Sequence, residues 1–218
     1  MALVNPLTIE MIKAANQIYT RLLDWQKNDR ALVVLGEKLP SFTFEEILLK
    51  ATAVNVLYGT NVYAIWKAAK HIHNLMTNIR PEDVEIEFVE EIAKVPETNR
   101  RFVSFASKFA HFFINQEKFP IKDSFAEDMI RYHLGGGNLF RVQDKPYCEY
   151  VTNLNNLKKL CGFNGSNRTF DRYLWLAGQY KKWRESNKEA YINSEVKLFF
   201  ENYSNNDICL RAFYQTSV

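Results

Sequence analysis

The chain has 218 residues and a hydrophobic fraction of 47%, enough for one compact domain or for two small lobes around a shared core. Its net charge of +3 excludes a polybasic nucleic-acid coat, although an average conceals any local basic face. The three cysteines form no CxxC pair, which argues against a disulfide framework and a zinc site, and no apolar run suits a membrane span or a signal peptide. We therefore expect a cytoplasmic, monomeric protein.

The first half of the chain has the periodicity of helices. Apolar spacing predicts a first helix from Leu7 to about Asn28. The capping box Thr43-Phe-Glu-Glu46 predicts the start of another, which Gly59 ends. Three more helices are expected, over residues 62–76 after a cap at Thr60 or Asn61, from Pro81 to Val95, and from Arg101 onward.

The second half is expected to continue in the same way. A turn containing Pro120 leads to Asp123, which opens a helix that Gly135-Gly136-Gly137 ends. A mixed segment precedes a long helix over residues 167–187, and the last segments are ambiguous between helix and strand. The sequence thus predicts an all-α or mainly α domain over residues 1–218, with two helical lobes, a cleft between them and a lobe boundary near residues 135–138.

The stretch from Arg101 to Asp123 carries the clearest chemistry. A hydrophobic helix is expected to carry Arg101 and Lys108 seven residues apart, which puts them on one face. A fold-back at Pro120 can bring Asp123 to that face. A carboxylate that stabilises a cationic sugar, together with a positioned amine, is the minimum equipment for cleaving a glycosidic bond.

Four elements of the sequence occur in an order that resembles a known superfamily. They are the helix–loop–helix stretch TAVNVLYGTNVYAIWKAAKHI, the hairpin VPETNRRFVSFASK, the turn FPIKDSF, and Asp171 followed by Trp175. Together they resemble the helix-hairpin-helix DNA glycosylases, and among these the 8-oxoguanine glycosylases of the archaeal type. The resemblance covers roughly residues 43 to 185, and it implies a two-lobed helical fold.

The resemblance also implies roles for individual residues. Asp123 would stabilise the sugar cation with Lys108 supporting it, while Phe105, Asp171 and Trp175 would hold the flipped base. The loop with Thr60 and Asn61 would enter double-stranded DNA, and the basic residues Arg100, Arg101 and Arg172 would contact phosphates. No metal or organic cofactor is implied. The activity would be removal of a damaged base, such as 8-oxoguanine, in association with the nucleoid.

Two departures separate this chain from the pattern. The hairpin has Pro96-Glu-Thr-Asn99 where the family has glycines that let backbone amides approach a phosphate. The position of the Schiff-base lysine is occupied by Arg101, and a guanidinium cannot act as an amine nucleophile. We therefore expect base excision with at most weak strand cleavage.

Each candidate also has a purely structural interpretation. Asp123 suits an ordinary helix N-cap, Lys108 suits a buried ion pair, and Asp171 with Trp175 suits one turn of an amphipathic helix. The histidines at positions 71 and 73 point apart on a helix, which disfavours a metal site. Two alternatives to the enzyme remain: a catalytically inactive DNA-binding module on the same scaffold, and a helical protein-interaction domain.

Overall fold

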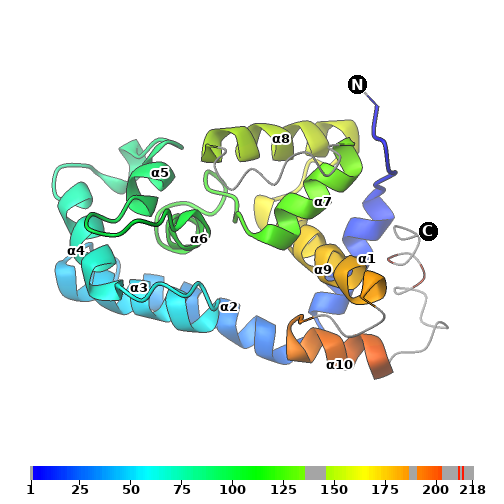
Figure 1. Ribbon diagram of the computed structural model, residues 1–218, viewed down its shortest axis with the longest axis horizontal. Helices are drawn as coiled ribbons and strands as arrows, with labels where there is room; N and C mark the ends of the chain where they lie inside the picture. The colour runs from blue at the N-terminus through cyan, green and yellow to red at the C-terminus, as the bar shows by residue number, and fades with distance from the viewer. Residues whose placement is uncertain (1, 136–145, 187–190, 203–210, 212, 214–218) are drawn as a thin grey trace. The chain divides into compact units, whose positions relative to one another are not determined.

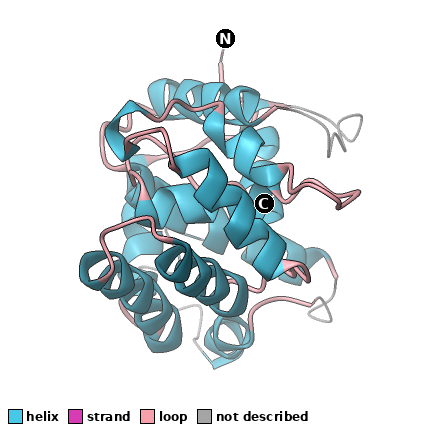
Figure 2. Ribbon diagram, turned by 90° about the vertical axis from the view of Figure 1, so that its left-hand side faces the viewer, coloured by secondary structure: helices cyan, strands magenta, loops and turns pink. Residues whose placement is uncertain are grey.

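The computed structural model describes residues 2–135, 146–186, 191–202, 211 and 213. Over these ranges the protein consists of helices and loops with no strand, which confirms the all-α prediction (Figures 1 and 2). Within the same ranges, no helix combines the length and the apolar character needed to cross a membrane. The helices are α1 (Ile9–Tyr19), α2 (Leu23–Lys38), α3 (Phe44–Leu57), α4 (Ile65–Met76), the 3-10 turn η1 (Pro81–Asp83), α5 (Phe88–Ala93), α6 (Val103–Phe113), α7 (Ser124–Leu134), α8 (Tyr147–Leu160), α9 (Asn167–Glu185) and α10 (Ser194–Asn202).

The chain divides into two compact units. The first comprises Met1–Lys27, Asp123–Lys145 and Tyr150–Val218, and in it α9 packs against α1, α7 and α10 (Figure 1). The second comprises Asn28–Lys122 and Pro146–Glu149, and in it α3 packs on α4 and α6 while α5 packs on the same two helices. The boundary expected near residues 135–138 falls, apart from Gly135, outside the described residues.

The predicted first helix is two helices, so the expectation of one continuous helix from Leu7 to Asn28 is wrong. The chain turns at Thr20, where Arg21 N–H and Leu22 N–H donate to carbonyls only three residues back, at 2.8 and 3.1 Å. The Glu195 carboxylate then accepts the first N–H groups of α2, from Asp24 at 2.9 Å and Trp25 at 3.0 Å. An acid 171 residues away thus caps α2.

Helix boundaries in the second unit agree with the sequence in part. The Thr43 hydroxyl accepts Glu46 N–H as predicted, but the Glu46 carboxylate lies 3.6 Å from Lys50 Nζ, an ion pair within α3. Neither Thr60 nor Asn61 caps α4, which begins at Ile65 without a side-chain cap. Pro81 opens only the short η1 turn, and the regular helix there is α5, which starts seven residues later.

In the C-terminal half, sequence signals predicted the ends of α7 and the position of α9, but they did not predict α8. Asp123 caps α7, and Gly135 ends it in the left-handed conformation at φ 84°. The helix over 167–187 is observed as α9 with Ser166 as its cap, and the ambiguous segment SEVKLFFENY begins with α10. Helix α8 lies in the segment for which the sequence predicts mixed secondary structure, and it is a regular helix. Most of the last segment, ICLRAFYQTSV, is outside the described residues.

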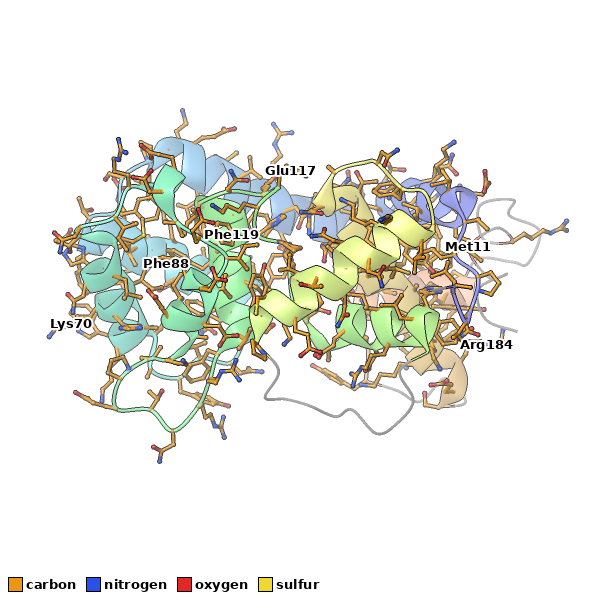
Figure 3. The ribbon with its side chains drawn as sticks, turned by 90° about the horizontal axis from the view of Figure 1, so that it is seen from above. Met11, Lys70, Phe88, Glu117, Phe119 and Arg184 are labelled. Carbon is orange, nitrogen blue, oxygen red and sulfur yellow. The ribbon has the colours of Figure 1, made fainter. Side chains whose placement is uncertain are left out.

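Large aromatic side chains are buried in both units. In the second unit Phe88 and Phe119 lie among the helices, whereas Lys70 of α4 lies at the surface (Figure 3). In the first unit Tyr180 of α9 contacts the rings of Trp183 and Phe200, with centroids 6.0 and 5.0 Å apart. Each large ring buried in this way removes a large apolar area from water and so stabilises its unit.

Helices α7 and α9 approach each other closely at Gly178. A Cβ added there would lie 2.7 Å from the Phe125 carbonyl oxygen and 2.8 Å from its Cβ. Gly178→Ala should therefore lower the free energy of unfolding by about 2 kcal/mol, because backbone atoms must move apart. The matched control is Gly36→Ala in α2. The new Cβ meets a Phe113 side-chain atom at 3.3 Å, and alanine has a higher helix propensity than glycine, so this change should cost less stability. Equal effects of the two changes in urea denaturation would contradict this account.

A buried histidine fastens the N-terminal segment to α7. His133 Nδ1 donates to the Asn5 carbonyl at 3.0 Å, and its Nε2 accepts the Tyr173 hydroxyl at 2.9 Å. Burial lowers the pKa of His133 below its ordinary 6.5, and burial also raises the pKa of Tyr173, which keeps the phenol a donor.

This histidine predicts how stability changes with pH. The unfolded chain holds the His133 proton more tightly than the folded chain, so its contribution is complete above about pH 6.5 and is lost as pH falls below it. Melting temperatures measured between neutral pH and pH 5 should fall, and His133→Gln should reduce that slope. An unchanged slope in the variant would assign the pH dependence to other groups.

Candidate functional site

The predicted hairpin is present as a turn between α5 and α6. Phe102 N–H donates to the Ala93 carbonyl at 3.0 Å, and Thr98 N–H donates to the Val95 carbonyl at 3.3 Å. Glu97 has φ 61°, a conformation that favours glycine. A glutamate thus occupies the left-handed turn position, and its carboxylate pairs with Lys67 at 2.5 Å.

Arg101 belongs to this turn and not to the helix. Helix α6 begins at Val103, so the expectation that Arg101 and Lys108 share one helix face is wrong. The reason is the non-helical backbone of Phe102, at φ −101° and ψ 51°. The Arg101 guanidinium forms an ion pair with Glu90 of α5, whose other oxygen accepts Tyr147 N–H at 2.6 Å. Arg101 therefore holds the hairpin together.

Lys108 is buried in the second unit, with 3% of its surface exposed. Its ammonium donates to the Ser104 hydroxyl at 2.7 Å and lies 5.7 Å from the centre of the Tyr58 ring. Tyr58 in turn donates its phenol proton to the Asp29 carboxylate. Sequence reasoning missed Asp29, because nothing in the local pattern shows that it meets Tyr58. It also missed Ser104, although Ser104 stands four residues before Lys108 on the same helix.

Phe105 lies on the same helix and is part of the core. Only 1% of its surface is exposed, and its ring centre lies 6.2 Å from that of Phe109. Stacking on a flipped base requires an open ring face. Phe105 must therefore change its packing if it is to contact a base.

The loop with the predicted DNA contacts is held from inside by Asn55. The Asn55 side-chain oxygen accepts the Thr60 hydroxyl and Val62 N–H, both at 2.8 Å, and its amide donates to the Val62 carbonyl at 3.2 Å. Asn61 lies at the exposed tip with φ 55°. Asn61 is thus presented outward, while Thr60 has a role within the loop.

The turn before Asp123 is fixed by three buried side chains of the second unit. His111 Nδ1 donates to the Phe119 carbonyl at 2.9 Å, and the Tyr147 hydroxyl donates to the Pro120 carbonyl at 2.5 Å. The Ser107 hydroxyl accepts Lys122 N–H at 3.0 Å. These bonds hold the backbone immediately before the catalytic candidate, and the sequence pattern did not reveal them.

Asp123 is the N-cap of α7. Its backbone is extended, and its Oδ1 accepts Ala126 N–H at 2.9 Å. The residue is half-buried. A carboxylate at a helix N-terminus accepts hydrogen bonds from backbone N–H groups and interacts favourably with the helix dipole. Both interpretations of Asp123, cap and charged stabiliser, are therefore compatible with the same geometry.

Three site candidates lie on α9 in the first unit. Asp171 forms a buried ion pair with Arg168 at 2.6 Å, and the Trp175 ring lies against Trp25 with centroids 3.9 Å apart. The Arg172 guanidinium carbon lies 3.8 Å above the Tyr19 ring centre of α1. Gly178, one turn after Trp175, touches Phe125 near the start of α7. Phe125, two residues after Asp123, thus packs against the part of α9 that follows Trp175.

The candidates divide between the two units. Asp123, Asp171, Arg172 and Trp175 belong to the first unit, and the hairpin, loop and Lys108 belong to the second. A contact between Lys108 and Asp123 and a facing pair of Phe105 and Trp175 remain predictions. Arg100 is exposed beside the hairpin.

The histidines on α4 and α6 bond to backbone carbonyls. His71 Nε2 lies 2.8 Å from the Glu91 carbonyl oxygen and His73 Nδ1 lies 3.2 Å from that of Phe42. Across the described ranges, no three or more His, Cys, Asp or Glu side chains are grouped so that they could hold a metal ion. The two α4 histidines therefore serve to tie α4 to neighbouring segments.

The fold and the candidate site define an all-helical protein of two compact units. A family model described as HI_0787_N, N-terminal domain, matches residues 10–118, half of the chain. A Haemophilus influenzae protein (strain ATCC 51907 / DSM 11121 / KW20 / Rd), described as an uncharacterized protein, is 33% identical over 155 residues, covering 67% of this chain and 73% of the relative. The chain belongs to the HI_0787_N family. No solved structure matches it.

Proposed function

We propose that this protein is a DNA glycosylase that flips a damaged or modified base out of double-stranded DNA and excises it. An oxidised purine such as 8-oxoguanine is the first substrate to test. The observation that carries the proposal is the place of Asp123 at the N-terminus of α7, directly after a turn fixed by buried hydrogen bonds.

In the proposed reaction, Asp123 is the main catalytic residue. Cleavage of the glycosidic bond builds positive charge on the sugar, and a fixed carboxylate stabilises that charge and activates the attacking water. The Asp123 carboxylate is already held by Ala126 N–H, so it need not reorganise during the reaction. Lys108 supplies a buried positive charge in support.

The base would be held by residues of the first unit. One face of the Trp175 indole lies against Trp25, so the base would stack on the other face. Such stacking contributes roughly 1–3 kcal/mol, enough to offset the cost of unstacking the base from the duplex. Asp171, oriented by Arg168, would accept hydrogen bonds from base N–H groups, which favours a purine.

A second candidate is an inactive DNA-binding module on the same scaffold. Two observations favour it: Asp171 is engaged by Arg168, and Phe105 is packed in the core. Measuring release of a free base separates this module from an enzyme, because both bind DNA but only the enzyme releases the base. A helical protein-interaction domain would show neither property.

DNA binding should depend on a local basic face and therefore on salt. Arg100→Glu should weaken duplex binding for every sequence and reduce the slope of log K against log salt by about 1. Arg172→Glu should also weaken binding, but it removes packing on Tyr19, so its melting temperature must be measured as well. Fluorescence anisotropy over a salt titration checks both changes.

The control for this prediction is Arg30→Glu, which makes the same charge change at another exposed arginine of the second unit. It should leave the salt slope close to that of the wild type. An affinity that does not change with salt in the wild-type protein would count against DNA as the partner.

A further inference from the structure

Four polar side chains meet inside the second unit. Asp29 comes from α2, Tyr58 from the end of α3, and Ser104 and Lys108 from α6. The surfaces of Asp29 and Lys108 are only 6% and 3% exposed. We call these four residues the Asp29 cluster.

Stability alone gives little reason for this cluster. Moving a carboxylate and an ammonium out of water costs several kcal/mol per ion, and apolar side chains of the same volume often stabilise a core as well or better. The rest of α6 shows that such side chains fit here, because Phe105, Phe109 and Phe112 are all buried on the same helix. The presence of the charged Lys108 side chain in this buried position therefore points to a role in function.

The contacts run from Asp29 through Tyr58 to the Lys108 ammonium. Asp29 accepts the phenol proton of Tyr58, and Phe112 packs against the Tyr58 ring with centroids 5.5 Å apart, so the ring is held on two sides. The ammonium lies over this ring at 5.7 Å and donates to Ser104, one turn earlier on its own helix. A phenol bonded to a carboxylate is more electron-rich, which strengthens its attraction for a cation.

The same tyrosine begins the loop that we expect to contact DNA. Tyr58 is the C-cap of α3, and Thr60 and Asn61 follow it within the loop that Asn55 holds. A short segment therefore joins the loop to the residue over which the ammonium lies.

We propose that Asp29 and Tyr58 are positioning residues that hold the Lys108 ammonium in one orientation for base excision. This proposal rests on the proposed glycosylase function and adds to it two residues that touch neither base nor sugar. They act through Lys108, by fixing where its charge lies while the sugar cation forms. Loss of that orientation should slow the chemical step and leave DNA affinity almost unchanged.

The test is single-turnover excision from duplexes that each carry one 8-oxoguanine, hypoxanthine, uracil or alkylated adenine, using whichever the wild-type protein excises fastest. Tyr58→Phe, which removes one oxygen atom and keeps the ring, should lower the rate constant by about tenfold, as should Asp29→Asn. The Kd for the duplex should stay within about twofold. The double variant should be no slower than the slower single variant, because both changes break the same chain of contacts.

Tyr191→Phe is the control, since Tyr191 is 93% exposed and lies outside the cluster, and it should excise at the wild-type rate. If Asp29→Asn does not fold, the rate constant of Tyr58→Phe alone tests the positioning role. Wild-type rate constants in the cluster variants, with or without a lower melting temperature, would show a structural role only and overturn this proposal while the glycosylase assignment stands. Failure of the wild-type protein to excise any of the bases would overturn the proposed function and this proposal with it.

Discussion

Asp123→Asn should abolish base excision while the protein remains folded. The amide cannot offset the positive charge that develops on the sugar, and loss of such a fixed charge costs ~3 kcal/mol, or at least about a hundredfold in rate. The fold should survive because asparagine is as good an N-cap as aspartate, and its side-chain oxygen can still accept Ala126 N–H. Single-turnover excision and thermal melting, measured together, check both halves of this prediction.

Two further variants separate the cap from the charge. Asp123→Ser keeps a capping oxygen without the carboxylate, so it should melt like the wild type and fail to excise. Asp123→Ala loses the cap as well and should lower stability by about 1 kcal/mol. Normal excision by Asp123→Ser would show that Asp123 is only a helix cap.

The wild-type protein should form no covalent DNA adduct when borohydride is added during the reaction. Such trapping needs an amine that attacks the sugar. The family position for that amine is occupied by Arg101, whose guanidinium cannot act as an amine nucleophile and pairs with Glu90. Lys108→Gln should lower excision by about tenfold, because it removes a buried supporting charge, and should likewise give no adduct. Gel analysis of borohydride-treated reactions measures both results.

Lys70→Gln provides the control, because Lys70 is an exposed lysine of α4 outside the candidate site (Figure 3). It should excise like the wild type. A trapped adduct that forms with the wild-type protein and is missing from Lys108→Gln would mean that Lys108 is the Schiff-base amine, and the monofunctional assignment would be wrong.

Local sequence signals predicted several helix ends, and they failed where residues far away in the sequence determine the boundary. The Thr43 and Asp123 caps, the Gly135 stop and helix α9 follow from residues within a few positions of each boundary. The break between α1 and α2 could not be predicted in this way, because the carboxylate that caps α2 belongs to Glu195, 171 residues after Asp24 in the chain. Pro81 was misjudged because its signal fits a 3-10 turn as well as a regular helix.

In the candidate site, too, local patterns predicted some features and missed those that depend on contacts between distant residues. The resemblance selected Lys108, Asp123 and Asp171 as site candidates, and the apolar neighbours of Lys108 predicted its burial, which the structure has at 3% exposure. The Asp29–Tyr58 bond and the Arg168–Asp171 pair depend on side-chain geometry, which spacing does not specify. Arg101 was misplaced because its position beside α6 depends on the turn at Phe102.

The glycosylase proposal is tested most directly by incubating the wild-type protein with duplexes that each carry one 8-oxoguanine, hypoxanthine, uracil or alkylated adenine, followed by alkaline cleavage at abasic sites. Excision leaves an abasic site, so alkali should cut at least one duplex at the position of the modified base, with 8-oxoguanine the expected substrate. Strand cleavage without alkali should be weak or absent. Intact strands in every duplex after alkali would contradict the glycosylase assignment and leave a DNA-binding module as the better account.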